Sequence, residues 1–369
     1  MKKIIAILTV LLLVYSCSSD DSTTNPDPDP SSFDRTLVLE NWADNIIIPG
    51  YQDFVSRSEN LTAEALSFQE NPSLDNLMAL RASWLVAYTT WQRISLFETG
   101  PAEDIGLRLN VNIYPADTSL IEDNILAGTY DFGLSSNRVA KGFPALDFLL
   151  HGDTEEALLA LYNGALGTNY LQYVVDITQD IQELSTQVRD EWTGGFRDTF
   201  VANNGSSATA SVDRLVNDYI FYYERFLRAG KMGIPGGVFS GTVAPQNIEA
   251  FYKGDISQAL FLEGLDATQD FFNGVAYNSS AQGASLSSSL EALNAVSNGA
   301  DLNDIINSQF NMARNAVQAL GSFADELEST PPIAFLEAYD EVQIIVPLLK
   351  VDMVSAMSIS IDFADADGD

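Results

Sequence analysis

The feature that most constrains the fold is an apolar spacing of three and four residues that recurs along most of the chain. It is clearest at 170–188, where the apolar residues are Tyr170, Val174, Ile177, Ile181, Leu184 and Val188. Residues at these spacings share one face of an α-helix, and that face needs a partner to cover it. Similar stripes occupy 39–55, 77–91, 212–226, 302–320 and 336–349. We therefore predict an all-α fold built from packed helical bundles.

The chain divides into two parts at 194–210, a stretch rich in Gly, Asn, Ser and Thr. Such a composition is typical of a connection between packed units. We therefore predict an N-terminal helical bundle at 34–193 and a C-terminal helical bundle at 205–369. At most one short C-terminal strand is expected, at 358–363, where apolar and polar residues alternate. The acidic end at 365–369 resembles the start of a calcium loop, although a frayed tail is the simpler interpretation.

Local signals add three structural predictions. The first helix is expected to kink or break at Pro49. Asp153 is expected to cap a later helix, because aspartate is a favoured residue at that position. The segment 100–117 has a mixed pattern with several turn residues, so we predict an ordered loop there.

The first 16 residues have the character of a secretory signal peptide, with two lysines before an apolar run too short to span a bilayer. Cys17 follows Leu-Val-Tyr-Ser, which resembles the lipobox of bacterial lipoproteins, where the cysteine is acylated. An ordinary signal peptide with an incidental cysteine is the alternative. Cys17 is the sole cysteine, so no internal disulfide is possible. Residues 17–33 are polar and alternate Asp with Pro, which predicts a disordered tether.

The formal net charge of the chain is -33. A surface this acidic repels nucleic acid and anionic lipid, so neither is an expected partner. Cations and basic protein surfaces suit it better, although high acidic charge often serves only solubility.

The segment 142–152 holds one carboxylate and the only histidine of the chain. Gly142 permits a sharp turn, and Pro144 suits the first turn of a helix. Asp147 would then lie within about one turn of a helix N-terminus, where a negative charge is favoured. The flanking residues are apolar, so we expect the segment to be buried and Asp147 to need a partner.

Several short segments form a pattern through their order and spacing; they are 45–49 with Tyr51, 100–104 with Tyr114 and Pro115, 142–152, 233–239 and 350–356. Together they resemble the imelysin-like family, which includes imelysin peptidases and iron-regulated envelope proteins of bacteria. The resemblance covers nearly all of 34–369. It implies two helical domains with a site near their interface, marked by the motif Gly-x-His-x-x-Glu.

This chain departs from that motif, because Pro144 stands at the histidine position and Asp147 at the glutamate position. A zinc peptidase centre needs several His or carboxylate ligands, and Pro144 offers none. His151 would lie about 10 Å further along a continuous helix, so it cannot take the same place. A packing role is the simpler interpretation of His151, against a ligand or pH-sensing role. We therefore assign no catalytic residue, and peptidase activity is the weaker hypothesis.

The predicted ligand-binding residues are Gly142, Pro144, Asp147, Glu103, Asp104 and Asp117. Loop geometry leaves open whether the last three reach Asp147. In the functional interpretation, Asp147 binds a ligand donor group or a cation, such as iron or another divalent ion. In the alternative, it forms a buried ion pair that only stabilises the interface. The candidate partners for that pair are Arg81, Arg93, Arg108 and Arg138.

The leading functional hypothesis is an imelysin-like lipoprotein of the bacterial cell envelope. It would be anchored in the outer membrane through Cys17 and would bind a ligand, cation or protein partner in iron uptake. The expected partners are envelope proteins of iron uptake, and this association with iron comes from the family resemblance alone. The alternatives are a metallopeptidase of the same family and a docking partner of an outer-membrane receptor without a small-molecule site.

Overall fold

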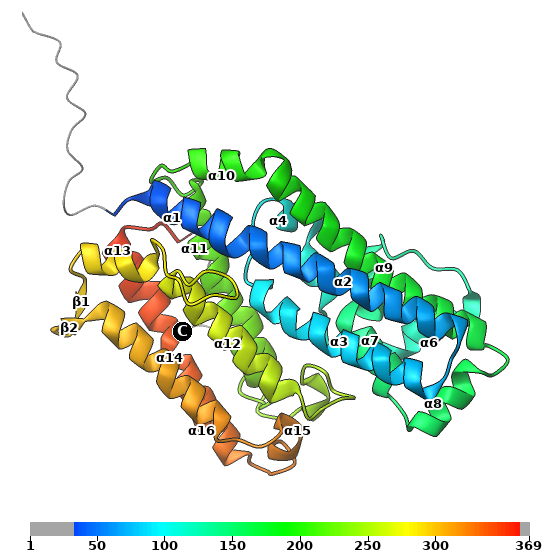
Figure 1. The fold of residues 1–369 in the computed structure, drawn as a ribbon. Helices are drawn as coiled ribbons and strands as arrows, with labels where there is room; N and C mark the ends of the chain where they lie inside the picture. Colours follow the sequence, from blue (N-terminus) through cyan, green and yellow to red (C-terminus); the bar gives the residue numbers. More distant parts are fainter. Residues whose placement is uncertain (1–32, 362–369) are drawn as a thin grey trace, which may run out of the picture.

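A computed structural model describes residues 33–361 as a nearly all-helical protein (Figure 1). Within this range the one sheet is the antiparallel pair β1 (Val296–Ser297) and β2 (Ala300–Asp301). The predicted all-α class is therefore confirmed. The described part of the predicted C-terminal strand is irregular, because Ser358 adopts a left-handed φ of 53° and ends α18 (Val354–Met357).

The predicted signal peptide, Cys17, nearly all of the predicted tether and the acidic end at 365–369 lie outside the described residues. None of the helices between residues 33 and 361 combines the length and apolar character needed to cross a membrane. The buried apolar residues form one continuous cluster from Val38 to Ile359. The division into two domains, 34–193 and 205–369, therefore stays a prediction.

Three long helices dominate the first part of the chain: α2 (Ile48–Glu70), α3 (Leu74–Ile94) and α9 (Gly167–Glu191). Helix α2 packs against the other two, and Figure 1 shows the three side by side. Their apolar stripes meet in the core, as the spacing predicts. The shorter elements are α1 (Arg35–Asn41), η1 (Trp42–Ile47), α4 (Pro101–Ile105), α5 (Leu107–Val111), α6 (Thr118–Ala127), η2 (Ser135–Ala140), α7 (Gly142–His151) and α8 (Glu155–Tyr162).

The second part of the chain is organised around α12 (Ser257–Asn273), which packs against α3 on one side and α14 (Leu302–Gln318) on the other. Helix α14 in turn packs against α16 (Ile333–Gln343). The other elements are η3 (Trp192–Phe196), α10 (Arg197–Ala202), α11 (Ser211–Phe221), η4 (Tyr222–Gly233), η5 (Pro245–Asn247), α13 (Leu286–Ala292), α15 (Phe323–Glu326), α17 (Ile345–Pro347) and η6 (Leu348–Met353).

Three local predictions need correction. The helix does not break at Pro49, one of the two predicted outcomes, because the π-helical element η1 directly precedes α2 and such a widened turn accommodates a residue without an N–H. The cap of α8 is Thr154 rather than Asp153; its side chain accepts a hydrogen bond from the N–H of Ala157. The expected loop at 100–117 contains the short helices α4 and α5.

Candidate functional site

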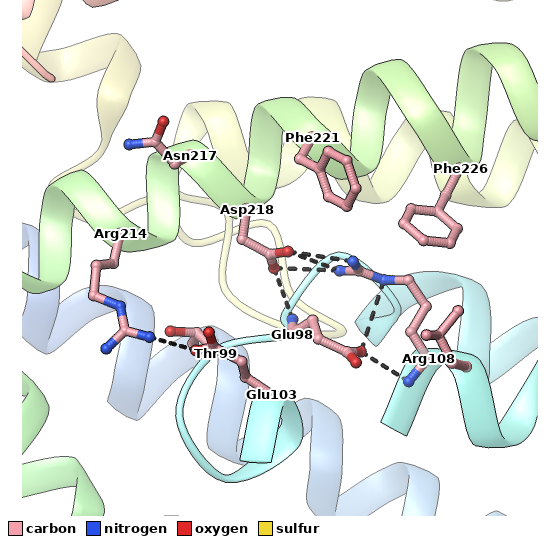
Figure 2. Close-up of a pocket in the computed structure, with 10 residues that line it drawn as sticks. Glu98, Thr99, Glu103, Arg108, Arg214, Asn217, Asp218, Phe221 and Phe226 are labelled. Carbon is pink, nitrogen blue, oxygen red and sulfur yellow. Dashed lines mark hydrogen bonds and ion pairs between the residues drawn. The ribbon is translucent and has the colours of Figure 1, made fainter. Parts of the chain in front are cut away.

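A pocket opens between α11 and the short helices α4 and α5 (Figure 2). Its volume is about 370 Å³. Gly106 separates α4 from α5 with a φ of 62°, and this turn places Arg108 in the pocket. We call it the Arg108 pocket; its lining residues are Glu98, Thr99, Glu103, Arg108, Leu109, Arg214, Asn217, Asp218, Phe221 and Phe226.

Arg108 forms the floor of the pocket and is 5% exposed. Its Nε donates to the carbonyl oxygen of Ser95 at 2.8 Å, and both terminal nitrogens donate to the Asp218 carboxylate at 3.2 Å. The Glu98 carboxylate accepts from the N–H of Arg108, and the N–H of Glu98 donates to Asp218, both at 2.8 Å. The ring of Phe226 covers the guanidinium at 4.7 Å. The floor is therefore a closed network that holds the side chains in fixed positions.

The three charged groups of the floor respond differently to burial. Burial raises the pKa of Glu98 to about 7, although the positive charge of Arg108 opposes the change. Burial also raises the pKa of Asp218, again against the effect of Arg108. Burial disfavours the charged form of Arg108, but the carboxylates of Asp218 and Glu98 outweigh it, and the pKa of Arg108 is raised. With a pKa of about 7, Glu98 exchanges its proton near neutral pH.

The walls of the Arg108 pocket combine apolar and charged side chains. Leu109 and Phe221 are each 39% exposed, and Figure 2 shows Phe221 and Phe226 on the helix that also carries Asp218. At the rim, Arg214 donates to Glu103, and both side chains are about half exposed. A ligand in this pocket would therefore meet an apolar wall and a charged floor.

The predicted motif residue Asp147 lies in a different place. It is 1% exposed, and its two oxygens accept hydrogen bonds from the N–H groups of Tyr252 and Lys253 at 2.8 and 3.0 Å. The sequence predicts that the N-terminus of its own helix stabilises Asp147. Asp147 is instead the sixth residue of α7, and its hydrogen-bond partners come from another segment. The carboxylate fastens the chain after η5 onto α7.

The predicted arginine partners of Asp147 are engaged elsewhere. Arg81 pairs with Glu155, Arg93 with Glu263 and Asp270, and Arg108 with Asp218. Among the described residues, Asp147 forms no ion pair with an arginine, and this includes Arg138. The interpretation of Asp147 as half of an arginine ion pair is therefore wrong, because backbone N–H groups take that role.

A small hollow of about 170 Å³ lies beside Asp147 and is also lined by Pro144 and Tyr114. Gly142 starts α7 with a φ of 75°, and a Cβ atom there would lie 2.2 Å from the carbonyl oxygen of Val111. Glycine is therefore required for this close approach, as the predicted sharp turn implies.

The predicted loop carboxylates do not gather around Asp147. Glu103 lies at the rim of the Arg108 pocket. Asp104 is in the first turn of α4. Asp117 caps α6, where its side chain accepts from the N–H of Leu120 at 3.0 Å. Of the six predicted site residues, Pro144 and Asp147 therefore line the small hollow, Glu103 lines the Arg108 pocket, and the other three line neither.

His151 packs against Trp84, with ring centroids 4.8 Å apart. Its Nδ1 lies 3.5 Å from the nearer oxygen of Asp147 and has no hydrogen-bond partner among the described residues. This arrangement agrees with a packing role.

The motif residues do not fit a peptidase zinc centre. Pro144 has no donor atom, and both oxygens of Asp147 already accept N–H groups. Within residues 33–361, no three His, Cys, Asp or Glu side chains gather closely enough to hold a metal ion.

A buried polar network lies between the two parts of the chain. Lys231 forms an ion pair with Glu249, and Gln92 and Asn112 both donate to the same carboxylate. Burial lowers the pKa of Lys231, while the neighbouring Glu249 acts in the opposite direction. All four side chains have partners, so we interpret this network as part of the packing between α3 and η4.

Glu98 and Asp218, the two carboxylates of the pocket floor, belong to none of the sequence motifs described above. A signal was present for one of them. Asp218 lies inside the apolar stripe at 212–226, directly before the buried Tyr219. Its side chain is 15% exposed, and a charge so largely removed from water needs a partner. The identity of that partner depends on the turn at Gly106, which the apolar pattern does not report.

Comparisons with known proteins agree with this fold. The family model described as Imelysin, a peptidase family, matches residues 47–342. Iron-regulated protein A of Synechococcus elongatus is 27% identical over 121 residues, and this match spans about a third of each of the two chains.

Two solved structures resemble the chain over most of its length. The structure of an imelysin-like protein from Psychrobacter arcticum has a TM-score of 0.70 at 18% identity, and the match covers 91% of this chain and 99% of that one. The structure described as a putative iron-regulated protein A precursor from Parabacteroides distasonis also has a TM-score of 0.70, at 16% identity. This match covers 89% of this chain and 97% of the other chain. At these identities the likeness establishes the fold.

Proposed function

The chain belongs to the imelysin family, and from this premise we propose that it is a ligand-binding lipoprotein of the bacterial cell envelope with a role in iron uptake. It acts by binding a ligand in the Arg108 pocket and not by hydrolysing peptide bonds. The name of the relative from Synechococcus elongatus supports the link to iron.

One observation carries the choice of the Arg108 pocket: its charged floor is assembled before any ligand arrives. Arg108, Asp218 and Glu98 fix one another through hydrogen bonds, so binding requires little reordering of their side chains. The pocket also has the size and the mixed apolar and polar lining of small-molecule sites. The hollow beside Asp147 is smaller, and the carboxylate there is already used by two backbone N–H groups.

Peptidase activity is the weaker alternative for this chain. The family's motif supplies a histidine where this chain has Pro144. Among the described residues, His151 is the donor beside Asp147, and these two side chains are too few for a catalytic metal site. The proposal therefore assigns no catalytic residue.

The lipid anchor rests on the leader sequence, which places Cys17 directly after a lipobox-like segment. The anchor would hold the acidic domain at the outer membrane, and the negative charge disfavours direct contact with anionic lipid. Fractionation of cells that express the protein tests this part. Wild-type protein is expected in the outer-membrane fraction, and Cys17→Ser is expected to leave it; an unchanged distribution would contradict the anchor.

The role of the Arg108 pocket is tested in the bacterium that encodes the protein. A deletion strain is expected to take up less iron and to grow more slowly when iron is scarce, and the wild-type gene should restore both. Leu109→Trp places a large side chain in the pocket and is expected not to restore them. Leu126→Trp is the matched control, because Leu126 is a 59% exposed leucine on α6, outside the pocket.

Two outcomes would overturn the proposal. A deletion strain with normal iron uptake would contradict the role in iron uptake. Full restoration by Leu109→Trp, with a protein level equal to wild type, would contradict the assignment of the ligand to the Arg108 pocket.

A further inference from the structure

The Arg108 pocket is lined by more acidic than basic side chains. Arg108 pairs with Asp218 at the floor, and Arg214 pairs with Glu103 at the rim. Each pair is neutral overall. The Glu98 carboxylate adds a negative charge beyond these two pairs. Its Oε2 lies 3.8 Å from Nε of Arg108, farther than the Asp218 oxygens lie from the same guanidinium.

The Glu98 carboxylate has a hydrogen bond to one of its oxygens and is largely shielded from water. One oxygen, Oε2, accepts from the N–H of Arg108, and the side chain is 14% exposed. A carboxylate in such a place is stabilised by a positive partner that replaces lost water. The charged and titratable groups that face Glu98 are Arg108 of α5, Asp218 of α11, Glu103 of α4 and Tyr51 of α2.

The wall beside this carboxylate is apolar. Leu109 and Phe221 each expose 39% of their surface. Phe226 packs against Phe221 with ring centroids 5.7 Å apart and covers the Arg108 guanidinium. Because the aromatic ring lies over Arg108, the positive charge at the floor is partly screened from a ligand in the pocket.

Resting on the proposed function, we propose that the Arg108 pocket binds a primary ammonium group carried on an apolar stem, with the Glu98 carboxylate as its counter-ion. The ammonium donates to Glu98, and the stem lies against Leu109 and Phe221. An anionic ligand would instead meet the negative charge of Glu98, which exceeds the two neutral pairs of the pocket. The net charge of -33 also attracts cations to the protein surface.

Binding of an ammonium favours the ionised form of Glu98, so affinity depends on pH. Burial raises the pKa of Glu98 to about 7, and the carboxylate is therefore mostly protonated at pH 6 and mostly ionised at pH 8. A probe that is charged at both values should bind about tenfold more tightly at pH 8. Tyr51 stays neutral over this range, because burial raises its pKa well above the usual value.

The test is calorimetric titration of the purified full chain in detergent with 2-phenylethylamine, at pH 6 and pH 8. We expect saturable binding that is about tenfold tighter at pH 8. The neutral isostere 2-phenylethanol is expected to bind at least about tenfold more weakly than the amine at pH 8. Equal binding of amine and alcohol, or no binding of the amine, would overturn the proposal.

A variant assigns the binding to Glu98. Glu98→Gln keeps the shape of the side chain and an acceptor for the N–H of Arg108, but removes the charge. It is expected to weaken amine binding about tenfold and to remove the pH dependence. Glu263→Gln is the matched control, since Glu263 is an ion-paired, partly buried glutamate outside the pocket. Unchanged affinity in Glu98→Gln would overturn the proposal, and thermal unfolding of each variant verifies the fold.

Two sources can supply this chemistry: a free amine, or a lysine side chain of a basic protein. Titration with the capped tripeptide acetyl-Ala-Lys-Ala-amide separates them. Tighter binding of the amine supports a free small molecule, and tighter binding of the peptide supports a lysine of a protein partner; failure of both overturns the ammonium site. That failure, together with loss of iron uptake in Leu109→Trp, would leave the proposed function intact and exclude only this ligand class.

Discussion

The carboxylate of Asp218 accepts hydrogen bonds from both terminal nitrogens of Arg108, although 110 positions separate the two residues in the sequence. Arg108 lies on α5 and Asp218 on α11, so this pair joins the two parts of the chain. Such bidentate pairing fixes the direction of the guanidinium. The floor of the Arg108 pocket therefore depends on a contact between distant segments.

Removal of Asp218 should destabilise the protein strongly. In Asp218→Ala the guanidinium of Arg108 stays buried without its main partner, which costs about 3–5 kcal/mol of unfolding free energy. Urea unfolding measures the change. Asp198→Ala is the control, because Asp198 forms an ion pair with 84% of its side chain exposed and should change stability little. A loss for Asp218→Ala no larger than that of the control would contradict the described floor.

The stability of the protein should depend on pH through Glu98. Burial raises the pKa of Glu98 from 4.5 to about 7. Below about pH 4 the carboxyl is protonated in the folded and the unfolded states. Between pH 4.5 and 7 only the folded state keeps the proton, so the unfolding free energy falls as pH rises, by about 3 kcal/mol in total, and stays low above pH 7.

Glu98→Gln isolates this effect, because the amide does not titrate. The variant should gain about 2.5 kcal/mol more stability relative to wild type at pH 8 than at pH 5. Urea unfolding at both pH values measures the difference. The same stability difference at the two pH values would show that Glu98 keeps its ordinary pKa.

The hydrogen bonds of Asp147 should stabilise the position of the segment that follows η5. In Asp147→Asn, one side-chain oxygen is replaced by an NH₂ group, which cannot accept from the N–H of Tyr252 or Lys253. We expect a loss of about 1–3 kcal/mol in unfolding free energy and faster hydrogen exchange at the one of these two amides that loses its acceptor. Asp255→Asn is the control, since Asp255 is 66% exposed and pairs only with the Lys253 side chain in the described contacts. Unchanged exchange in Asp147→Asn would contradict this role.

Gly142 should tolerate no side chain. Gly142→Ala forces a Cβ to within 2.2 Å of the carbonyl oxygen of Val111 at a φ of 75°, so we expect a loss of at least about 2 kcal/mol in unfolding free energy. Gly194→Ala is the matched control, because a Cβ at that position would meet nothing within 4 Å. Equal thermal stability of the two variants would contradict the described approach of α7 to α5.

The apolar spacing predicted the long helices well, because each one buries a continuous stripe. Helix α9 runs from Gly167 to Glu191 around the predicted face, and α14 begins at the predicted Leu302. Prediction failed where a neighbouring turn decided the outcome. Pro49 stays inside a helical stretch because η1 precedes it, and the short helices α4 and α5 depend on the glycine between them.

The candidate site was less predictable than the fold. The motif drew attention to Asp147, but nothing in its local sequence reports that the N–H groups of Tyr252 and Lys253 reach it from 105 and 106 positions away. Glu98 lies just after α3 and carries no local sign of burial. Its environment is set by Asp218 and Arg108, so only the assembled structure identifies it.

The most direct test of the account is a pH titration of the Glu98 carboxyl carbon by ¹³C NMR, with and without 2-phenylethylamine. Protein labelled at the glutamate side-chain carboxyl supplies the signal, and Glu98→Gln assigns it. We predict a pKa of about 7 for Glu98 in the free protein and a lower pKa in the presence of the amine, because the ammonium stabilises the ionised form. A pKa near 4.5, or a titration curve that the amine leaves unchanged, would contradict the account.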